Sequence, residues 1–330
     1  MDVIKLNRND NLPVGEKSIS KKVQGYYFNS LAENTIRSYA NDIVCFGNFC
    51  KENGLNYFED AENFNFKIIH PIPPKIIATY LVYLVEDKKY AVSTVGRRIA
   101  GIKKLHVTQK LPSPADDEFV KGVHRGIKRS FGTHKKQAEA IRKADIIRAI
   151  EKIDAQTKKG VRDKAIILIG YCGAFRRSEL ANLKFENITF VKGKGIEVFM
   201  DKSKTDQEGR GMTKVISSSS NKDTCPVTAL VNWLKVSQIK GGRLFPTVTC
   251  VDDILYDKFI NGNSINRMIK EYFGKKFSGH SLRVGICVEL SENNMEIYKI
   301  QRLGGWKTAA MPVRYTKQAN EWKTKNDIFQ

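Results

Sequence analysis

The chain has 330 residues, with 56 Lys and Arg against 35 Asp and Glu, so its formal net charge is +21 at pH 7. Hydrophobic residues make up 41% of the chain, which is enough for a sizeable core in one or two domains and argues against wholesale disorder. Because so large a positive surplus works against a compact state, it indicates a polyanionic partner, either nucleic acid or an anionic membrane surface.

Several other classes of protein find no support in the sequence. The longest apolar stretch, residues 165–175, is too short to cross a bilayer and predicts a buried helix. The first residues lack the apolar segment of a secretory signal, and the six cysteines show no CxxC spacing, which predicts reduced thiols. No GxxxxGK[ST] loop or HExxH motif is present, so we expect no nucleotide, no metal and no other cofactor.

The first part of the chain predicts a helical domain. Residues 1–25 are polar and predict a loose lead-in, after which apolar residues recur at helical spacing over residues 26–130. A proline-rich break at 70–74 separates the first helix from the next. The four predicted helices begin near Asn34, Ile76, Ser93 and Asp116.

A linker is predicted at residues 131–137, where the sequence is rich in Gly, small polar residues and lysine. Basic residues flank it on both sides, and between residues 121 and 143 only Glu139 opposes them. Since a solvated helix face usually mixes its charges, this one-sided run favours a surface that contacts phosphates. Its members are Lys121, Arg125, Lys128, Arg129, Lys135, Lys136, Arg142 and Lys143.

Residues 138–330 predict a second domain that is mostly helical, with one small antiparallel sheet. Residues 196–201 alternate like a strand, DQEGRG supplies a turn, and residues 212–216 return as the partner strand. The other elements are predicted to be helices. They are expected from Asp145, over 160–175, from Pro226 to about Gln238, and near Ser264, Ser281 and Met295.

Three short motifs in the second domain could carry chemistry. They are FRRSEL at 175–180, GHSLRVG at 279–285 and LGGWKTAAMPVRYTK at 303–317. Taken singly, each has a plain structural explanation: Glu179 can be the i+3 partner of Arg176, His280 a capping residue, and Trp306 a core residue. Their fixed order on so basic a chain, with Tyr315 nine positions after Trp306, is harder to explain in that way.

In this order the motifs resemble those of the tyrosine recombinase (phage integrase) family, and most closely its Cre type. Arg176 with Glu179 resembles the first arginine box of the family, and His280 with Arg283 resembles its H-x-x-R box. The Val-Gly pair that follows the second arginine is similar to the Cre type, as is a tryptophan in the Gly-Gly-Trp motif. Tyr315 falls where the family has its nucleophile.

The resemblance covers about residues 25–320 and implies a mainly α fold, with a helical core-binding domain and a mostly α catalytic domain that contains a small antiparallel sheet. It implies site-specific DNA recombination without metal or ATP, through a 3′-phosphotyrosyl intermediate and a Holliday junction. Arg176 and Arg283 would bind the phosphate, because guanidiniums are permanently charged forks. His280 would relay a proton or donate a hydrogen bond, and Glu179 would orient the first arginine.

Two further roles follow from the resemblance. The indole of Trp306 can donate a hydrogen bond to a non-bridging oxygen but cannot transfer a proton. The family places a lysine on a β-hairpin as the general acid that protonates the leaving 5′ oxygen. Lys204 in DKSKTDQ is the best match, with Lys202 as the fallback.

Double-stranded DNA is the expected partner, and the basic run before and within the linker is expected to contact it, together with Arg97 and Arg98 on the third helix. The resemblance implies a monomer when free and a homotetramer on DNA. The C-terminal tail, with Trp322, Ile328 and Phe329, would dock on a neighbouring subunit, or pack on its own domain. We expect no membrane association and a cytoplasmic, nucleoid-associated location in a bacterial, phage or plasmid system.

Other functions share the same motifs. A type IB topoisomerase-like or telomere-resolving enzyme would use the same active site, and a non-catalytic DNA-binding protein could adopt the same fold. All six polar positions carry chemically competent residues, which argues against the non-catalytic alternative. If Tyr315 were not the nucleophile, Tyr298 would be the next candidate.

Overall fold

The computed structural model describes residues 33–60, 65–133, 137–201 and 211–324. The chain divides into two compact units, Met1–Lys135 and Lys136–Gln330. The division lies within the segment 131–137, for which the sequence predicts a linker.

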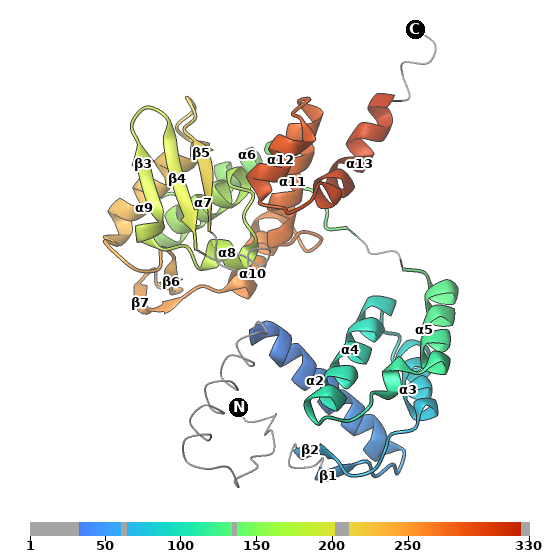
Figure 1. The fold of residues 1–330 in the computed structure, drawn as a ribbon. Coiled ribbons are helices and arrows are strands. Elements are labelled where there is room, and N and C mark those ends of the chain that lie inside the picture. Colours follow the sequence, from blue (N-terminus) through green and yellow to red (C-terminus); the bar gives the residue numbers. More distant parts are fainter. Residues whose placement is uncertain (1–32, 61–64, 134–136, 202–210, 325–330) are drawn as a thin grey trace, which may run out of the picture. The chain divides into compact units, whose positions relative to one another are not determined.

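The first unit consists of helices and one small sheet (Figure 1). Four helices occur at the predicted places, although the helices that follow the first begin one or two residues away from the predicted starts. A two-stranded antiparallel sheet was not predicted, because its strands are short and their pairing is irregular. The elements are α2 (Glu33–Glu52), β1 (Phe58–Asp60), β2 (Asn65–Ile68), α3 (Pro74–Glu86), α4 (Val92–Thr108), a 3-10 turn (Pro114–Asp116) and α5 (Glu118–Phe131).

An aromatic cluster forms the core of this unit. Phe46 and Phe49 of α2 contact Tyr80 of α3 with ring centroids 5.0 Å apart, and Phe58 of β1 contacts Phe46 edge to face at 6.0 Å. Aromatic pairs in these geometries add stability beyond their buried area. The small sheet is therefore held against the helices by side chains that the helical spacing alone could not reveal.

The second unit contains all six helices predicted for it, together with α8 and α13, and more sheet than predicted (Figure 1). Its helices are α6 (Lys143–Lys152), α7 (Lys158–Cys172), α8 (Arg177–Ala181), α9 (Pro226–Ser237), α10 (Gly262–Phe273), α11 (Gly279–Glu292), α12 (Ile297–Gly304) and α13 (Ala310–Thr324), with a 3-10 turn at Phe185–Asn187. Its strands are β3 (Ile188–Val191), β4 (Gly195–Met200), β5 (Met212–Ser217), β6 (Pro246–Val248) and β7 (Ile254–Phe259).

The predicted strand pair is confirmed and belongs to a three-stranded antiparallel sheet in the order β3-β4-β5. In the register of this sheet, Val198 of β4 is opposite Lys214 of β5, and Ile196 is opposite Ile216. The predicted turn DQEGRG, residues 206–211, lies outside the described residues except for Gly211. Strand β3 and the β6–β7 pair were not predicted, since β3 and β6 are short and β6–β7 has an irregular register.

Helix α7 lies in the core, as the apolar run at 165–175 predicts. Residues 165–169 of this helix are each at most 2% exposed. The core around them includes Trp233 of α9, Phe245 and Leu282 of α11. Helix α7 also packs against α8 and α11, near which two of the sequence motifs lie.

A close backbone contact fixes α11 against the segment that precedes α6. The amide of Ile141 donates to the carbonyl of Ser281 at 3.1 Å. A Cβ atom at Gly285 would lie 1.9 Å from the carbonyl oxygen of Ile141. Only glycine fits at this position, so the Val-Gly pair after Arg283 has a packing role.

Among the described residues, no helix is both long and apolar enough to cross a bilayer. The same part of the chain holds no cluster of three or more His, Cys, Asp or Glu that could bind a metal ion.

We expect Gly285→Ala to lower the free energy of unfolding of the second unit by about 2 kcal/mol, because the new methyl group meets rigid backbone. All three tryptophans belong to this unit, so denaturant unfolding followed by tryptophan fluorescence measures it selectively. Gly126→Ala in α5 is the control, since its Cβ meets nothing within 4 Å, and it should leave the tryptophan transition unchanged. An unaltered midpoint for Gly285→Ala would contradict the close contact.

Candidate active site

Arg176 caps the short helix α8 and is held by Glu179. The backbone amide of Arg176 donates to Glu179 Oε2 at 2.9 Å, and its guanidinium donates to Glu179 Oε1. The Arg176 side chain is 17% exposed and that of Glu179 is 7% exposed. The i+3 pairing predicted from the sequence therefore exists, and it orients an arginine that remains partly accessible.

Arg283, in the second turn of α11, has a fully buried side chain. Its Nη1 donates to the carbonyl of Ala174 at 2.6 Å and lies 4.0 Å from Glu179 Oε2. Its Nη2 is buried and has no hydrogen-bond partner among the described residues. A buried donor without a partner is costly, and an anionic oxygen is the acceptor that would satisfy it best.

His280 and Tyr315 are in direct contact. His280 Nε2 is 2.8 Å from Tyr315 Oη, and the two rings meet edge to face with centroids 5.6 Å apart. His280 lies in the first turn of α11 and Tyr315 on α13, and Tyr315 is only 5% exposed. The second and third motifs of the sequence are thus joined at one hydrogen bond.

Trp306 contacts both Tyr315 and Arg283. Its ring centroid is 5.8 Å from that of Tyr315, and the Arg283 Cζ stacks on it at 3.9 Å. The Gly-Gly before it is required: a Cβ at Gly304 would be 1.7 Å from the indole, and Gly305 is left-handed with φ +67°. The stacking holds Arg283 in place, which adds to the hydrogen-bond role that the sequence suggested.

Electrostatics of the site come from burial and from its two arginines. Burial, then the charges of Arg283 and Arg176, lowers the pKa of His280 to about 4. Burial lowers the pKa of Arg283 to about 10, with a further contribution from Arg176. Burial raises the pKa of Tyr315, and Arg283 and Arg314 partly offset this. At neutral pH the site therefore holds a neutral imidazole, a protonated phenol and charged guanidiniums.

The structure adds a residue that sequence reasoning missed. Lys214 on β5 is 3% exposed, and its Nζ donates to the carbonyls of Gly173 at 2.8 Å and Leu303 at 2.6 Å. Burial and then Arg283 lower its pKa to about 7. The alternation of MTKVIS placed this lysine on the same face as buried Ile216, which was the signal available in the sequence.

Lys204 and the fallback Lys202 lie outside the described residues, so the assignment of the general acid to either of them stays a prediction. Tyr298, the second-choice nucleophile, is 52% exposed on α12. Of the two tyrosines, Tyr315 is the one hydrogen-bonded to His280, which favours it over Tyr298.

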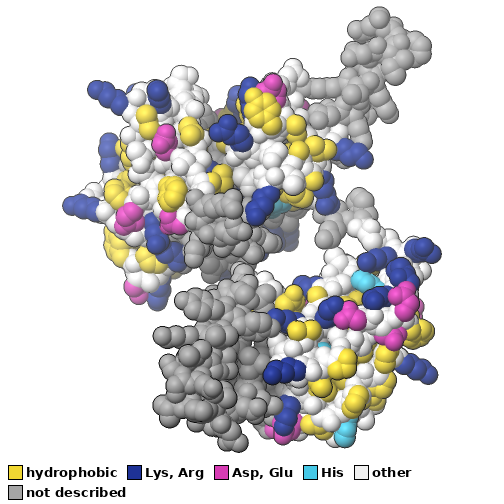
Figure 2. Space-filling view, in the orientation of Figure 1, with side chains coloured by type: hydrophobic (Ala, Val, Ile, Leu, Met, Phe, Trp, Pro, Cys, Tyr) yellow, Lys and Arg dark blue, Asp and Glu magenta, His cyan; other side chains and the backbone are white. Residues whose placement is uncertain are grey.

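The basic residues of α5 form an exposed face. Figure 2 shows Lys and Arg side chains gathered over this helix. Lys121, Arg125, Lys128 and Arg129 lie on it with partly or largely exposed side chains, and Arg125 pairs with Glu118. Lys135 and Lys136 lie outside the described residues. The four on α5 can therefore face a polyanion.

Arg97 and Arg98, the two residues of α4 that were expected to contact DNA, are both engaged within the first unit. Arg98 is 4% exposed, donates to Tyr80 Oη at 3.1 Å and stacks on Tyr90, so it is a core residue rather than a DNA contact. It occupies the buried face of α4, which carries Val95 and Ile102. Arg97 is 40% exposed but is paired with buried Asp42, which restricts its guanidinium.

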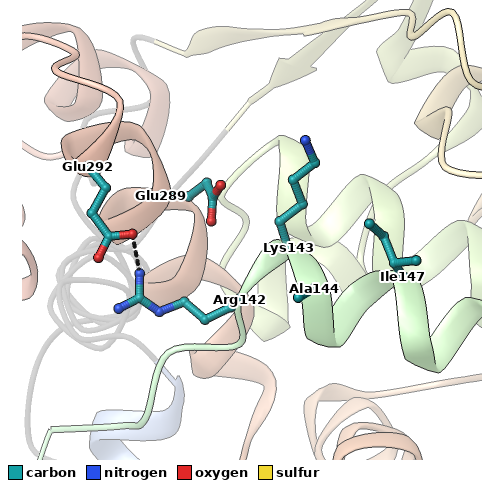
Figure 3. Close-up of a pocket in the computed structure, with 6 residues that line it drawn as sticks. All are labelled: Arg142, Lys143, Ala144, Ile147, Glu289 and Glu292. Atoms are coloured by element: carbon teal, nitrogen blue, oxygen red, sulfur yellow. Dashed lines mark hydrogen bonds and ion pairs between the residues drawn. The ribbon is translucent and has the colours of Figure 1, made fainter.

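A separate pocket of about 540 Å³ lies between the start of α6 and the end of α11 (Figure 3). Arg142 and Glu292 form an ion pair at 2.6 Å at this pocket, and Lys143, Ala144, Ile147 and Glu289 complete its lining. The described catalytic candidates do not line it. Arg142, counted with the basic run in the sequence, is therefore neutralised by a carboxylate.

The lowered pKa of His280 makes stability depend on pH. Below about pH 6.5 the unfolded chain protonates this imidazole, whereas the folded site keeps it neutral down to about pH 4. The unfolded state then binds more protons, so the free energy of unfolding decreases as the pH falls from about 6.5 to about 4. We expect His280→Gln to reduce this decrease, measured by denaturant unfolding at both ends of the window.

His70→Gln, at an exposed position, is the control. This variant should show the same pH dependence of tryptophan-detected unfolding as the parent protein. If His280→Gln and the parent lose stability equally on acidification, His280 is not held neutral by the fold.

Chemically, the arrangement can bind a phosphate and activate a phenol. Two guanidiniums, one with an unsatisfied buried donor, provide positive charge where a phosphorane would develop negative charge. A neutral imidazole at hydrogen-bond distance from Tyr315 can accept the phenol proton in the tautomer that leaves Nε2 unprotonated.

Comparison with known proteins identifies relatives over most of the chain. A model of the phage integrase family matches residues 139–321. An integrase/recombinase XerD homolog of Selenomonas ruminantium is 31% identical over 314 residues, which cover 92% of this chain and 87% of that one. The recombinase Cre of Escherichia phage P1 is 25% identical over 295 residues, covering 82% and 79%.

The fold is also similar to solved structures. The XerH site-specific recombinase, bound to a palindromic difH substrate in a post-cleavage complex, matches with a TM-score of 0.56 at 16% identity, covering 89% of each chain. The family match spans more than half of this chain, and the Selenomonas relative covers nearly all of it. The chain therefore belongs to the phage integrase family of tyrosine recombinases.

Proposed function

We propose that this protein is a site-specific recombinase that cleaves and rejoins DNA with Tyr315 as the nucleophile. The observation that carries the proposal is the 2.8 Å contact between His280 Nε2 and Tyr315 Oη, beside an Arg283 whose buried Nη2 has no acceptor among the described residues. Relatives named as recombinases, at identities of 31% and 25%, support the same activity.

In the proposed cleavage step, Arg176 and Arg283 bind the non-bridging oxygens of the scissile phosphate. The burial of Arg283 in a low-dielectric site strengthens its attraction for the charge that builds up in the transition state. Trp306 keeps this guanidinium in place by stacking, and Glu179 does the same for Arg176 through their ion pair.

Tyr315 Oη then attacks the phosphorus, and a 3′-phosphotyrosyl bond forms as the bond to the 5′ oxygen breaks. His280 takes the phenol proton, which is possible because its pKa of about 4 leaves it neutral at working pH. Since burial raises the pKa of Tyr315, deprotonation has to coincide with phosphate binding. Lys204, or Lys202, protonates the leaving 5′ oxygen.

The substrate is double-stranded DNA, held in part by the exposed basic face of α5. Solved relatives with a similar fold include XerH bound to difH and a lambda integrase dimer bound to a core site, which supports a DNA partner. In the full reaction the 5′ hydroxyl of a second duplex attacks the phosphotyrosyl bond, and a Holliday junction links the duplexes. This exchange requires four protomers on DNA, with the C-terminal tail of each docked on a neighbouring protomer. The free protein is a monomer in this proposal.

The role of Tyr315 as nucleophile can be tested directly. Tyr315→Phe should abolish the covalent protein–DNA adduct on a nicked suicide substrate, because the attacking hydroxyl beside His280 is gone, while leaving DNA affinity unchanged. Adduct is measured on denaturing gels and affinity by gel shift. Tyr298→Phe, at an exposed position on a neighbouring helix, is the matched control and should form adduct normally.

Persistence of the adduct in Tyr315→Phe would refute the assignment, and its loss in Tyr298→Phe alone would move the nucleophile there. The products also separate related activities. Recombinant strands support the proposal, whereas relaxed circles or hairpin ends would indicate a topoisomerase-like or telomere-resolving enzyme.

The basic face of α5 can be tested through the salt dependence of DNA binding. Replacing Lys121 and Lys128 together by Gln should weaken DNA binding and reduce the slope of log Kd against log salt by about 2, roughly one for each phosphate that a lysine no longer neutralises. Lys235→Gln, a lysine at the end of α9, is the control. An unchanged slope in the double variant would show that α5 does not contact phosphates.

A further inference from the structure

Lys214 occupies a position that usually holds an apolar residue. It faces the core side of β5, two residues before Ile216, which is 1% exposed, and opposite Val198, which is fully buried. Its ammonium lies 5.0 Å from the centre of the buried Phe175 ring. It makes no ion pair with any carboxylate among the described residues, so its charge is held by backbone carbonyls.

Such a residue destabilises a core unless it is well satisfied, because removing an ammonium from water costs several kcal/mol. A leucine or methionine would fill the same position without that cost. The lysine is therefore explained by what its two hydrogen bonds achieve.

The first bond fixes the segment between α7 and α8. Gly173 accepts from Lys214, and the next residue, Ala174, accepts from Arg283. Ala174 has φ +47°, a conformation that a residue other than glycine adopts only when its surroundings impose it. Two cations thus hold successive carbonyls of the segment that ends at Arg176.

The second bond fixes the turn that carries Trp306. Leu303 accepts from Lys214 just before Gly304 and Gly305. Met212, two residues earlier on β5, approaches the same turn so closely that a Cβ at Gly305 would lie 2.5 Å from its sulfur. Strand β5 therefore contacts the Gly-Gly-Trp turn at two points.

From this geometry we propose that Lys214 is a positioning residue for strand cleavage: one buried ammonium ties the Arg176 segment and the Trp306 turn to β5 and so sets both on the scissile phosphate. The inference rests on the proposed cleavage activity. It also assigns to β5 a link between the sheet and the phosphate-binding groups, with no contact between Lys214 and the substrate.

A positioning role differs from that of the general acid expected of Lys204. A general acid must reach the 5′ oxygen and give up a proton to it. Lys214 is 3% exposed, and its Nζ is engaged with two carbonyls. The two roles are separable with a substrate in which sulfur replaces the bridging 5′ oxygen, since a thiolate leaves without protonation.

The experiment measures single-turnover adduct formation on nicked duplexes with either a 5′ oxygen or a 5′ sulfur leaving group. Lys214→Met should slow cleavage of both substrates by about 100-fold, as small misplacements of catalytic groups do. Lys204→Met should be slow on the oxygen substrate and recover on the sulfur substrate. Lys192→Met, a lysine that directly follows β3 of the same sheet, is the matched control and should cleave both normally.

A double-mutant cycle tests the route of the effect. If Lys214 acts through the turn, its loss should cost clearly less in a Trp306→Ala background than in the parent. Lys214→Arg, which keeps two donors, should retain more activity than Lys214→Met and provides the comparison if the methionine variant does not fold, as judged by tryptophan-detected unfolding.

Parent-like cleavage by Lys214→Met, or its rescue by the sulfur substrate, would overturn the proposal, and so would additivity with Trp306→Ala. Parent-like activity of Lys214→Arg would support the proposal. Activity of Lys214→Arg no better than that of a folded Lys214→Met would oppose the proposal. The parent protein is run alongside: if it forms no adduct, the proposed cleavage activity itself fails, which is a different result.

Discussion

The guanidinium of Arg283 is the group on which the rest of the active site depends. It is fully buried, bonded to the carbonyl of Ala174, close to Glu179 and stacked against Trp306. Three segments far apart in the sequence therefore meet at one charged side chain. A group so enclosed can hold a phosphate oxygen in a fixed place, because folding has already desolvated and oriented it.

Much of the fold and of the active site could be predicted from the sequence, because the signals are local patterns and short motifs. Helical spacing predicted α7 and α9, since each buries one face of a continuous segment. The order of Arg176, His280 and Tyr315 identified residues that the fold indeed brings together. Strands β1, β2, β6 and β7 were missed because short, irregular pairs are stabilised by tertiary contacts and not by their own pattern.

Two basic residues that the structure buries were not recognised as buried from the sequence: Arg98 was expected to contact DNA, and Lys214 was given no role. Arg98 recurs with Val95 and Ile102 on the buried face of α4, and Lys214 recurs with Ile216 on the buried face of β5. Periodicity carried the correct answer in both cases. For Arg98, the basic side chain was given more weight than its position on the helix, although a buried cation with good hydrogen bonds is stable.

The crowding of cations around Arg283 also bears on the protein before it meets DNA. Burial and the charge of Arg176 lower the pKa of Arg283 to about 10, and burial and the charge of Arg283 lower that of Lys214 to about 7, so each would hold its proton more firmly in an unfolded chain. These buried cations therefore lower the stability of the folded site, and burial of the apolar core around α7 has to compensate for this. In the proposed reaction the scissile phosphate would be both substrate and counterion, so we expect the enzyme to be more stable when it is bound to DNA.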